Sequence, residues 1–175
     1  VAIVGGRSQD NLEGYTLNRA YQSARQPGSS LKPLLVYAPA LERGYTPGST
    51  VDDSPMSSSD PHKVRNSGNS YRGSISLRAA VMKSSNVATM RLYESLTPKT
   101  ALSYLEKMHF SHLVERDYKY YTTCLGGMTY GVTTEEMAAG FATLANDGEY
   151  RAPTCIEEIT DSSGALIVKG STGTK

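Results

Sequence analysis

Helix start and stop signals recur along this chain, and they restrict most of it to short helices joined by turns. The clearest case spans residues 26–44. There a Gln-Pro-Gly breaker precedes two serines, and apolar residues then recur at helical spacing up to Gly44. Pro33 suits a first helical turn, whereas Pro39 is expected to kink or shorten the helix. Residues 26–44 are therefore predicted to form one helix.

Further helix signals occur between residues 74 and 150, and we expect a helical subdomain there. Ser74 is interpreted as the cap of its first helix, and Thr97, followed by a proline, as the start of another. Thr133 and Glu136 have the spacing of a capping box. The expected helices cover residues 74–83, 87–96, 97–108 and 133–145.

Strand signals occur near both ends of the chain. Residues 1–7 contain a short apolar run ended by two glycines, and residues 155–168 contain two strand-like runs around an Asp-Ser-Ser-Gly turn. Residues 45–73 are rich in Ser, Pro, Gly, Asp and Asn, which predicts a long ordered loop with one short strand at residues 50–51. Pattern alone thus indicates a mixed, helix-rich chain.

The charge balance excludes several classes of partner. Lys and Arg total 18 against 17 for Asp and Glu, so the formal net charge is +1. Such a balance argues against binding to nucleic acid or to an anionic membrane surface through a basic patch. The 175 residues would suffice for one domain. However, the chain opens within a strand-like run and closes without a further element, so we expect it to be part of a larger protein.

Cysteines and histidines do not form a recognisable ligand pattern. Cys124 and Cys155 lack Cys-x-x-Cys spacing and are predicted to be small, buried or half-buried side chains, with a disulfide between them left open. His62, His109 and His112 are not spaced with the cysteines as metal ligands. We therefore expect neither a metal nor a cofactor.

One helix start carries a pair of residues suited to nucleophilic catalysis. Ser29 precedes Lys32 by three positions, which places both side chains on one helix face. A serine hydroxyl becomes a useful nucleophile when a base takes its proton, and a lysine whose pKa is lowered by burial can be that base. The pair alone is weak evidence, because a capping serine and a solvated lysine have the same spacing.

A second motif supports this interpretation. Ser84 and Asn86 lie in a short break between two predicted helices, and they offer a hydroxyl for proton transfer and an amide for a substrate carbonyl. Residues 67–69 repeat the Ser-x-Asn pattern. We favour Ser84, because residues 67–69 belong to a loop rich in Gly and Ser.

The run Arg25-Gln26-Pro27-Gly28-Ser29-Ser30-Leu31-Lys32-Pro33 resembles the active-site signature of the penicillin-binding proteins, specifically the transpeptidase domain of the bifunctional, class A type. Further similarities occur in family order at residues 1–7, 41–48, 71–80, 84–88, 125–127 and 131–148. The resemblance implies an α+β fold. The chain would be the helix-rich portion of the penicillin-binding protein transpeptidase and serine β-lactamase-like fold, with part of the antiparallel sheet missing.

The resemblance implies a D,D-transpeptidase that cross-links peptidoglycan stem peptides. Ser29 would attack the substrate's D-Ala-D-Ala terminus and form an acyl-enzyme, and its backbone N–H would be one oxyanion donor. Lys32 would accept the serine proton, Ser84 would pass a proton to the leaving group, and Asn86 would hold the substrate amide and Lys32. β-Lactam antibiotics would acylate Ser29.

The family's third motif is missing in its expected form. No Lys-Thr-Gly or Lys-Ser-Gly occurs, and the nearest run begins at Ser171, where the lysine should stand. Either a second chain or a missing segment carries the remaining sheet, or residues 171–175 are a coincidental tail. The first interpretation is favoured, so the isolated chain is expected to be weakly active or inactive.

Two other functions stay open on the same resemblance. One is a catalytically dead cell-wall binding or scaffold module, and the other is a β-lactamase or β-lactam sensor of the same fold. The location that the resemblance implies is the extracytoplasmic face of a bacterial cell membrane. The anchor would be a segment absent from this chain.

Overall fold

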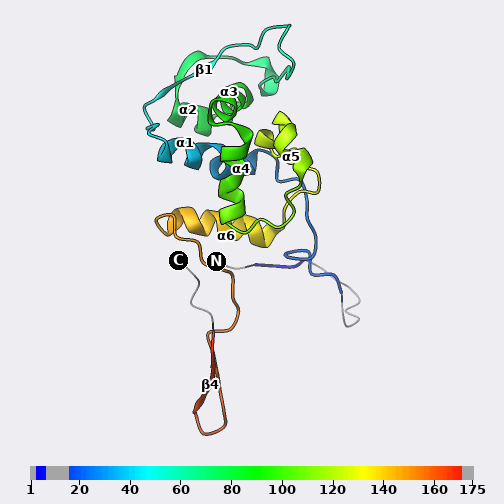
Figure 1. Cartoon of the computed structure of the whole chain (residues 1–175), viewed down its shortest axis with the longest axis vertical. Helices are drawn as coiled ribbons and strands as arrows, with labels where there is room; N and C mark the ends of the chain where they lie inside the picture. The colour runs from blue at the N-terminus through cyan, green and yellow to red at the C-terminus, as the bar shows by residue number, and fades with distance from the viewer. Residues whose placement is uncertain (1–2, 7–15, 171–175) are drawn as a thin grey trace.

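The computed structural model describes residues 3–6 and 16–170. Most of these residues form a helical body. An antiparallel hairpin of β3 (Glu158–Thr160) and β4 (Leu166–Lys169) projects away from that body (Figure 1). Helices and short antiparallel strands thus occur together, in agreement with the predicted α+β class.

The segment predicted as one helix over residues 26–44 is a continuous helical run of three geometries. A 3₁₀ turn, η1 (Gly28–Leu31), leads into a π-helical turn, η2 (Pro33–Tyr37), and then into α1 (Ala38–Glu42). Pro39 in α1 has no N–H to donate to the carbonyl of Leu35 four residues earlier, which accounts for the departure from regular α geometry in η2. The run begins and ends close to the predicted positions, but it is less regular than predicted.

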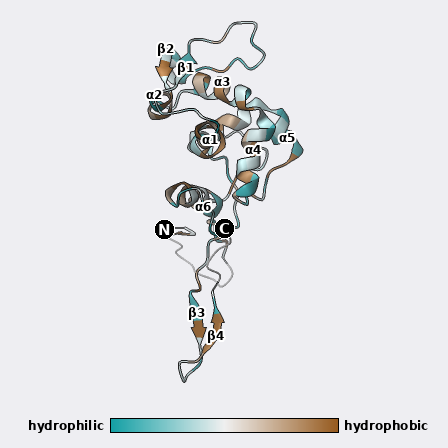
Figure 2. Ribbon diagram, turned by 60° about the vertical axis from the view of Figure 1, so that its left-hand side comes forward, coloured by the Kyte–Doolittle hydropathy of each residue, from teal (hydrophilic) through white to brown (hydrophobic). Residues whose placement is uncertain are grey.

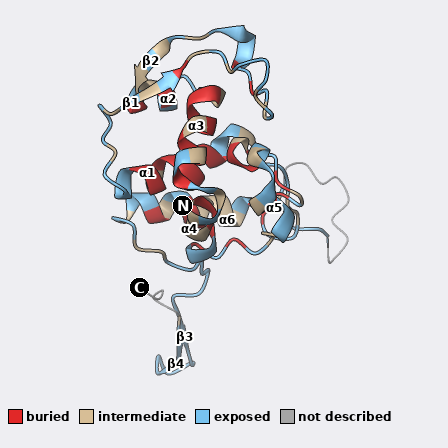
Figure 3. Cartoon of the chain, turned by 45° about the horizontal axis from the view of Figure 1, so that its top comes forward, coloured by how far each residue is buried: buried red, intermediate tan, exposed pale blue. Residues whose placement is uncertain are grey.

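The hydrophobic core is built around this run. Leu31, Leu34, Leu35 and Val36 are fully buried, as expected for a helix that is apolar on all sides. The helices α3 (Asn86–Leu96) and α4 (Pro98–Lys107) pack against it. Figure 3 shows the buried residues gathered in the body, most of all on α3, whereas the hairpin is exposed.

The long loop contains one strand, and its partner corrects a prediction. β1 (Thr50–Asp53) pairs antiparallel with β2 (Gly73–Ser76), which overturns the helix expected to begin at Ser74. The helix α2 (Leu77–Met82) starts three residues later, and the Ser76 hydroxyl accepts the Ala79 N–H at 3.2 Å as its cap. Pairing with β1 draws these residues into a strand, and each partner residue lies at least 20 positions earlier in the chain.

The last helices complete the body. α5 (Glu115–Lys119) and the 3₁₀ turn η4 (Tyr121–Leu125) follow α4, and another 3₁₀ turn, η3 (Ser67–Asn69), lies in the long loop. α6 (Thr134–Ala145) lies at the end of the body nearest the hairpin (Figure 1). It begins with the predicted capping box, in which Thr133 Oγ1 accepts the Glu136 N–H at 3.1 Å and Glu136 Oε2 accepts the Thr133 N–H at 2.7 Å.

The strand predictions near the two ends of the chain have different outcomes. Residues 3–6 carry no strand, and the Gly5 carbonyl accepts the Arg19 N–H at 3.2 Å instead; the other positions of the predicted strand at 1–7 lie outside the described residues. A strand needs a neighbour for its backbone hydrogen bonds. β3 and β4 do form the pair predicted for residues 155–168, and Figure 2 shows hydrophobic residues on part of each strand, away from the body. In the ranges that the structure describes, no helix combines the length and the apolar character needed to cross a membrane.

Candidate active site

Ser29 lies on an exposed turn at the start of the buried helical run. It belongs to η1 and follows Gly28, whose φ of +56° is a left-handed conformation that favours glycine. Ser29 lines a pocket of about 280 Å³ together with Ser84 and Asn86. The structure thus brings the two sequence motifs to one hollow, although they are more than 50 residues apart.

The turn that carries Ser29 is held from the side by residues 126–132. The Gln26 side chain accepts the Met128 N–H at 2.7 Å and donates to the Met128 carbonyl, and Arg25 and Val132 exchange two backbone hydrogen bonds. Gly126 lies so close that an added Cβ would stand 2.2 Å from the Gly28 carbonyl oxygen. These contacts restrict the position of the residues directly before Ser29.

The Lys32 amine is buried and faces the Ser-x-Asn loop. The residue is 1% exposed, and Nζ donates to Asn86 Oδ1 at 2.7 Å, to the Ser84 carbonyl at 2.8 Å and to Ser84 Oγ at 3.2 Å. The Ser85 carbonyl lies 3.3 Å away. Burial lowers the pKa of Lys32 to about 8, because desolvation disfavours the charged ammonium. At pH 7 roughly one Lys32 in ten is then neutral and able to accept a proton.

The loop that receives Lys32 has an unusual backbone. Ser84 follows α2 with a φ of +50°, in the left-handed region where a residue with a Cβ is strained. Ser85 caps α3, because its hydroxyl accepts the Ala88 N–H at 3.0 Å. The strained residue and the helix start together turn the carbonyls of Ser84 and Ser85 and the side chains of Ser84 and Asn86 toward Lys32.

Of the four predicted site residues, three are in direct contact and the fourth lines the same pocket. Lys32 bonds to Ser84 and Asn86, whereas the Ser29 hydroxyl has no hydrogen-bond partner among the described residues. Hydrogen bonds of catalytic groups are often long before substrate binds. Lys32 contacts residues 84–86 and not the rival Ser-x-Asn pattern at 67–69, although Ser67 also lines the pocket.

The sequence did not reveal a buried polar group beneath the Ser-x-Asn loop. Asp53 is fully buried and accepts hydrogen bonds from the side chains of Asn66 and Ser85. Two cations that the sequence also left unassigned, Arg72 and Lys83, line the pocket with Ser29. Asp53 and Asn66 belong to the segment from β1 to β2, where the chain shows no periodic pattern that could have marked them.

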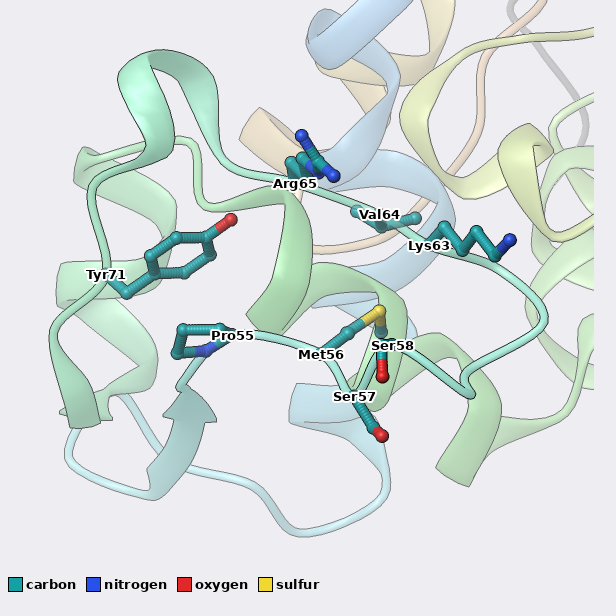
Figure 4. Close-up of a pocket in the computed structure, with 8 residues that line it drawn as sticks. All are labelled: Pro55, Met56, Ser57, Ser58, Lys63, Val64, Arg65 and Tyr71. Carbon is teal, nitrogen blue, oxygen red and sulfur yellow. The ribbon is translucent and has the colours of Figure 1, made fainter.

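A larger hollow of about 410 Å³ lies beside this site in the loop between β1 and β2. Figure 4 shows Tyr71 on one side of it and Met56 and Val64 on the other. None of the four predicted site residues lines this hollow. Its connection to the site is the backbone carbonyl of Arg65, which accepts the Asn86 side-chain amide at 2.9 Å.

The two cysteines have different surroundings. Cys124 is buried, as predicted, and burial raises its pKa to about 12, whereas Cys155 is exposed, which the prediction missed. Both thiols are free, so the disulfide left open by the sequence is not formed. In the part of the chain covered by the structure, no three His, Cys, Asp or Glu residues are grouped to hold a metal ion.

Comparison with known proteins connects this geometry to one family. The profile of the penicillin binding protein transpeptidase domain matches residues 1–174. Over 170 residues the chain is 39% identical to penicillin-binding protein 4 of Bacillus subtilis, covering 97% of this chain and 26% of that protein. It is 34% identical to penicillin-binding protein 1A of Pseudomonas aeruginosa, covering 97% of this chain and 20% of that one. The chain therefore spans about a quarter or less of these relatives.

Solved structures agree with the sequence matches. Penicillin-binding protein 1A from Haemophilus influenzae superimposes with a TM-score of 0.72 at 32% identity, over 88% of this chain and 23% of that chain. The PonA1 protein of Mycobacterium tuberculosis in complex with penicillin V gives a TM-score of 0.76 at 26% identity, over 91% of this chain and 45% of that chain. Both similarities include most of the helical body described above.

Proposed function

Because this chain belongs to the family of penicillin-binding protein transpeptidase domains, we propose that it carries the nucleophile and the proton-transfer groups of a D,D-transpeptidase. The substrate would be the D-Ala-D-Ala terminus of a peptidoglycan stem peptide. The observation that supports this most strongly is the buried Lys32 amine, which has a lowered pKa and contacts Ser84 and Asn86, two residues that line a pocket with Ser29.

The proposed reaction is an acyl transfer in two steps. Ser29 Oγ attacks the carbonyl of the penultimate D-Ala while neutral Lys32 takes the hydroxyl proton. Ser84 Oγ, 3.2 Å from the Lys32 amine, passes a proton to the departing amine of the terminal D-Ala. An ester on Ser29 remains, and the amine of a neighbouring stem peptide attacks it to form the cross-link and regenerate the serine.

Two further groups would stabilise and orient the substrate. The Ser29 N–H lies in the first turn of η1, where backbone donors lack acceptors within the helix and can bind a developing oxyanion. Asn86 would hold the substrate amide while its oxygen keeps Lys32 in place. β-Lactams would acylate Ser29 by the same attack, because their strained amide imitates the peptide bond.

The third motif sets an expectation for the isolated chain. The sequence contains no Lys-Thr-Gly or Lys-Ser-Gly, and residues 171–175, which hold the nearest run, lie outside the described residues. We expect the 175 residues alone to react weakly with β-lactams, and a second chain or further segment to supply the remaining strands. The site would act at the extracytoplasmic face of a bacterial membrane, anchored by a segment outside this sequence.

Covalent labelling tests the proposal. A fluorescent penicillin should label the whole protein that carries this chain, mass spectrometry should place the adduct on Ser29, and Ser29→Ala should abolish it. Ser30→Ala is the matched control, because the Ser30 hydroxyl donates a hydrogen bond to the Pro27 carbonyl at 2.6 Å. An unlabelled wild-type protein would overturn the proposal and favour the catalytically dead binding module. Rapid hydrolytic turnover of the adduct would instead favour a β-lactamase.

A further inference from the structure

A buried carboxylate lies under the Ser84–Asn86 loop. Asp53 is 0% exposed, and no basic side chain pairs with it within residues 16–170. Its oxygens accept the Asn66 side-chain amide at 2.6 Å, the Arg72 backbone N–H at 3.2 Å and the Ser85 hydroxyl. A buried carboxylate without a cation is costly unless such donors satisfy it, so the arrangement depends on all of them.

Each side-chain donor on Asp53 also holds part of the loop that contacts Lys32. The Ser85 hydroxyl that donates to Asp53 caps α3 through the Ala88 N–H, and the Ser85 carbonyl faces Lys32 Nζ at 3.3 Å. Asn66 donates to Asp53 through its nitrogen and accepts the Asn86 N–H at 2.8 Å through its oxygen. Asp53 is therefore connected to two of the groups around the Lys32 amine: to the Ser85 carbonyl through Ser85 itself, and to Asn86 through Asn66.

The position of Asp53 is itself fixed against α3. The Arg91 guanidinium on α3 donates at 3.0 Å to the carbonyls of Asp52 and Ser54, which flank Asp53 in sequence. The carboxylate, the loop and the first turns of α3 thus form one connected unit. The strained backbone of Ser84, at a φ of +50°, is held within it.

We propose that Asp53 is a positioning residue for acylation, which holds the Ser84–Asn86 loop against Lys32 through Ser85 and Asn66. The inference rests on the proposed function only for its kinetic consequence. Asp53 does not line the pocket with Ser29, so it acts through its neighbours and not on the substrate. If Asp53 lost its charge and one of its acceptor oxygens, the Ser84–Asn86 loop would shift relative to Lys32. The acylation step would then slow, while non-covalent β-lactam binding stayed nearly constant.

The test compares two equivalent changes at adjacent positions in the whole protein. Asp53→Asn keeps the shape but turns an amide toward groups that donate hydrogen bonds. Asp52→Asn makes the same change on an exposed side chain that is paired with Arg91 at 2.7 Å and does not contact the loop. For labelled penicillin we expect the acylation rate constant of Asp53→Asn to fall roughly ten- to a hundredfold. The non-covalent dissociation constant of Asp53→Asn should stay within about twofold of the wild-type value. For Asp52→Asn, both the acylation rate constant and the dissociation constant should stay within the same range.

A second variant keeps the proposal testable if Asp53→Asn does not fold. Ser85→Ala removes one donor to Asp53 and leaves Asn66 and Arg72 on the carboxylate. Like Asp53→Asn, it should lower the acylation rate constant. If Asp53 acts through Ser85, the two substitutions together should cost clearly less than the product of their separate effects. If Asp53→Asn does not fold, a Ser85→Ala protein that acylates at the wild-type rate would overturn the proposal. If it folds, fully multiplicative effects or a wild-type acylation rate in Asp53→Asn would overturn it.

Hydrogen exchange separates failure of this inference from failure of the proposed function. The Asn86 and Val87 N–H groups, which Asn66 accepts at 2.8 and 3.1 Å, should exchange at least about tenfold faster in Asp53→Asn than in wild type or Asp52→Asn. This readout needs no acylation. A wild-type protein that is not labelled would contradict the transpeptidase, whereas unchanged exchange at these two amides would contradict the positioning role.

Discussion

Asn86 offers a test of Lys32 as the base, because two substitutions there shift the pKa of Lys32 in opposite directions. Asn86 Oδ1 accepts a hydrogen bond from Lys32 Nζ at 2.7 Å, and burial holds the pKa of Lys32 at about 8. Asn86→Asp places a negative charge at this distance and favours the ammonium. Asn86→Ala removes the acceptor and disfavours the ammonium.

The size of the effect follows from the fraction of neutral amine. An opposite charge at hydrogen-bond distance raises a pKa by about 1–3 units, so in Asn86→Asp the neutral fraction at pH 7 falls from roughly one in ten to one in a hundred or less. The acylation rate at pH 7 should fall at least about tenfold. The midpoint of the rate against pH should move above 8 in Asn86→Asp and below 8 in Asn86→Ala, relative to the wild-type pKa of about 8.

The assay is the rate of labelling by a fluorescent penicillin across a pH series, with wild type and both variants as whole proteins. Both substitutions remove the Asn86 amide that donates to the Arg65 carbonyl, so loss of that bond affects both alike and cannot produce opposite shifts. If all three midpoints coincide, Lys32 is not the group whose deprotonation limits acylation, and its proposed role as the base is wrong.

Two other predictions concern packing and thiol chemistry. Gly126→Ala should destabilise the protein by about 1–3 kcal/mol more than Gly164→Ala in thermal unfolding. Both glycines have positive φ, but a Cβ on Gly126 meets the backbone of Gly28, whereas Gly164 has open space around it. Equal losses of stability in the two variants would show that the close approach of Gly126 to Gly28 is not the cause. A maleimide should modify exposed Cys155 in the native protein within minutes and spare buried Cys124 until denaturant is added, as followed by mass spectrometry; equal rates would contradict the burial of Cys124.

Local signals predicted those parts of the fold that depend on neighbouring residues. The caps at Thr97 and Thr133 lie where the sequence placed them, because each requires a partner only three positions away. Ser74 was wrongly interpreted as a cap, because residues 73–76 pair with β1 across the long loop. Asp53 escaped prediction for a related reason, since its burial and its donors come from three separate segments.

The sequence by itself determined the chemical groups of the site and the spacing of each motif. The offsets of three positions from Ser29 to Lys32, and of two from Ser84 to Asn86, are properties of the local chain. Only the tertiary structure decided that the Lys32 amine meets a loop more than 50 residues away and loses its water there. Burial and long-range hydrogen bonds arise from the packing of the whole body, and they turn an ordinary lysine into a group with a pKa of about 8.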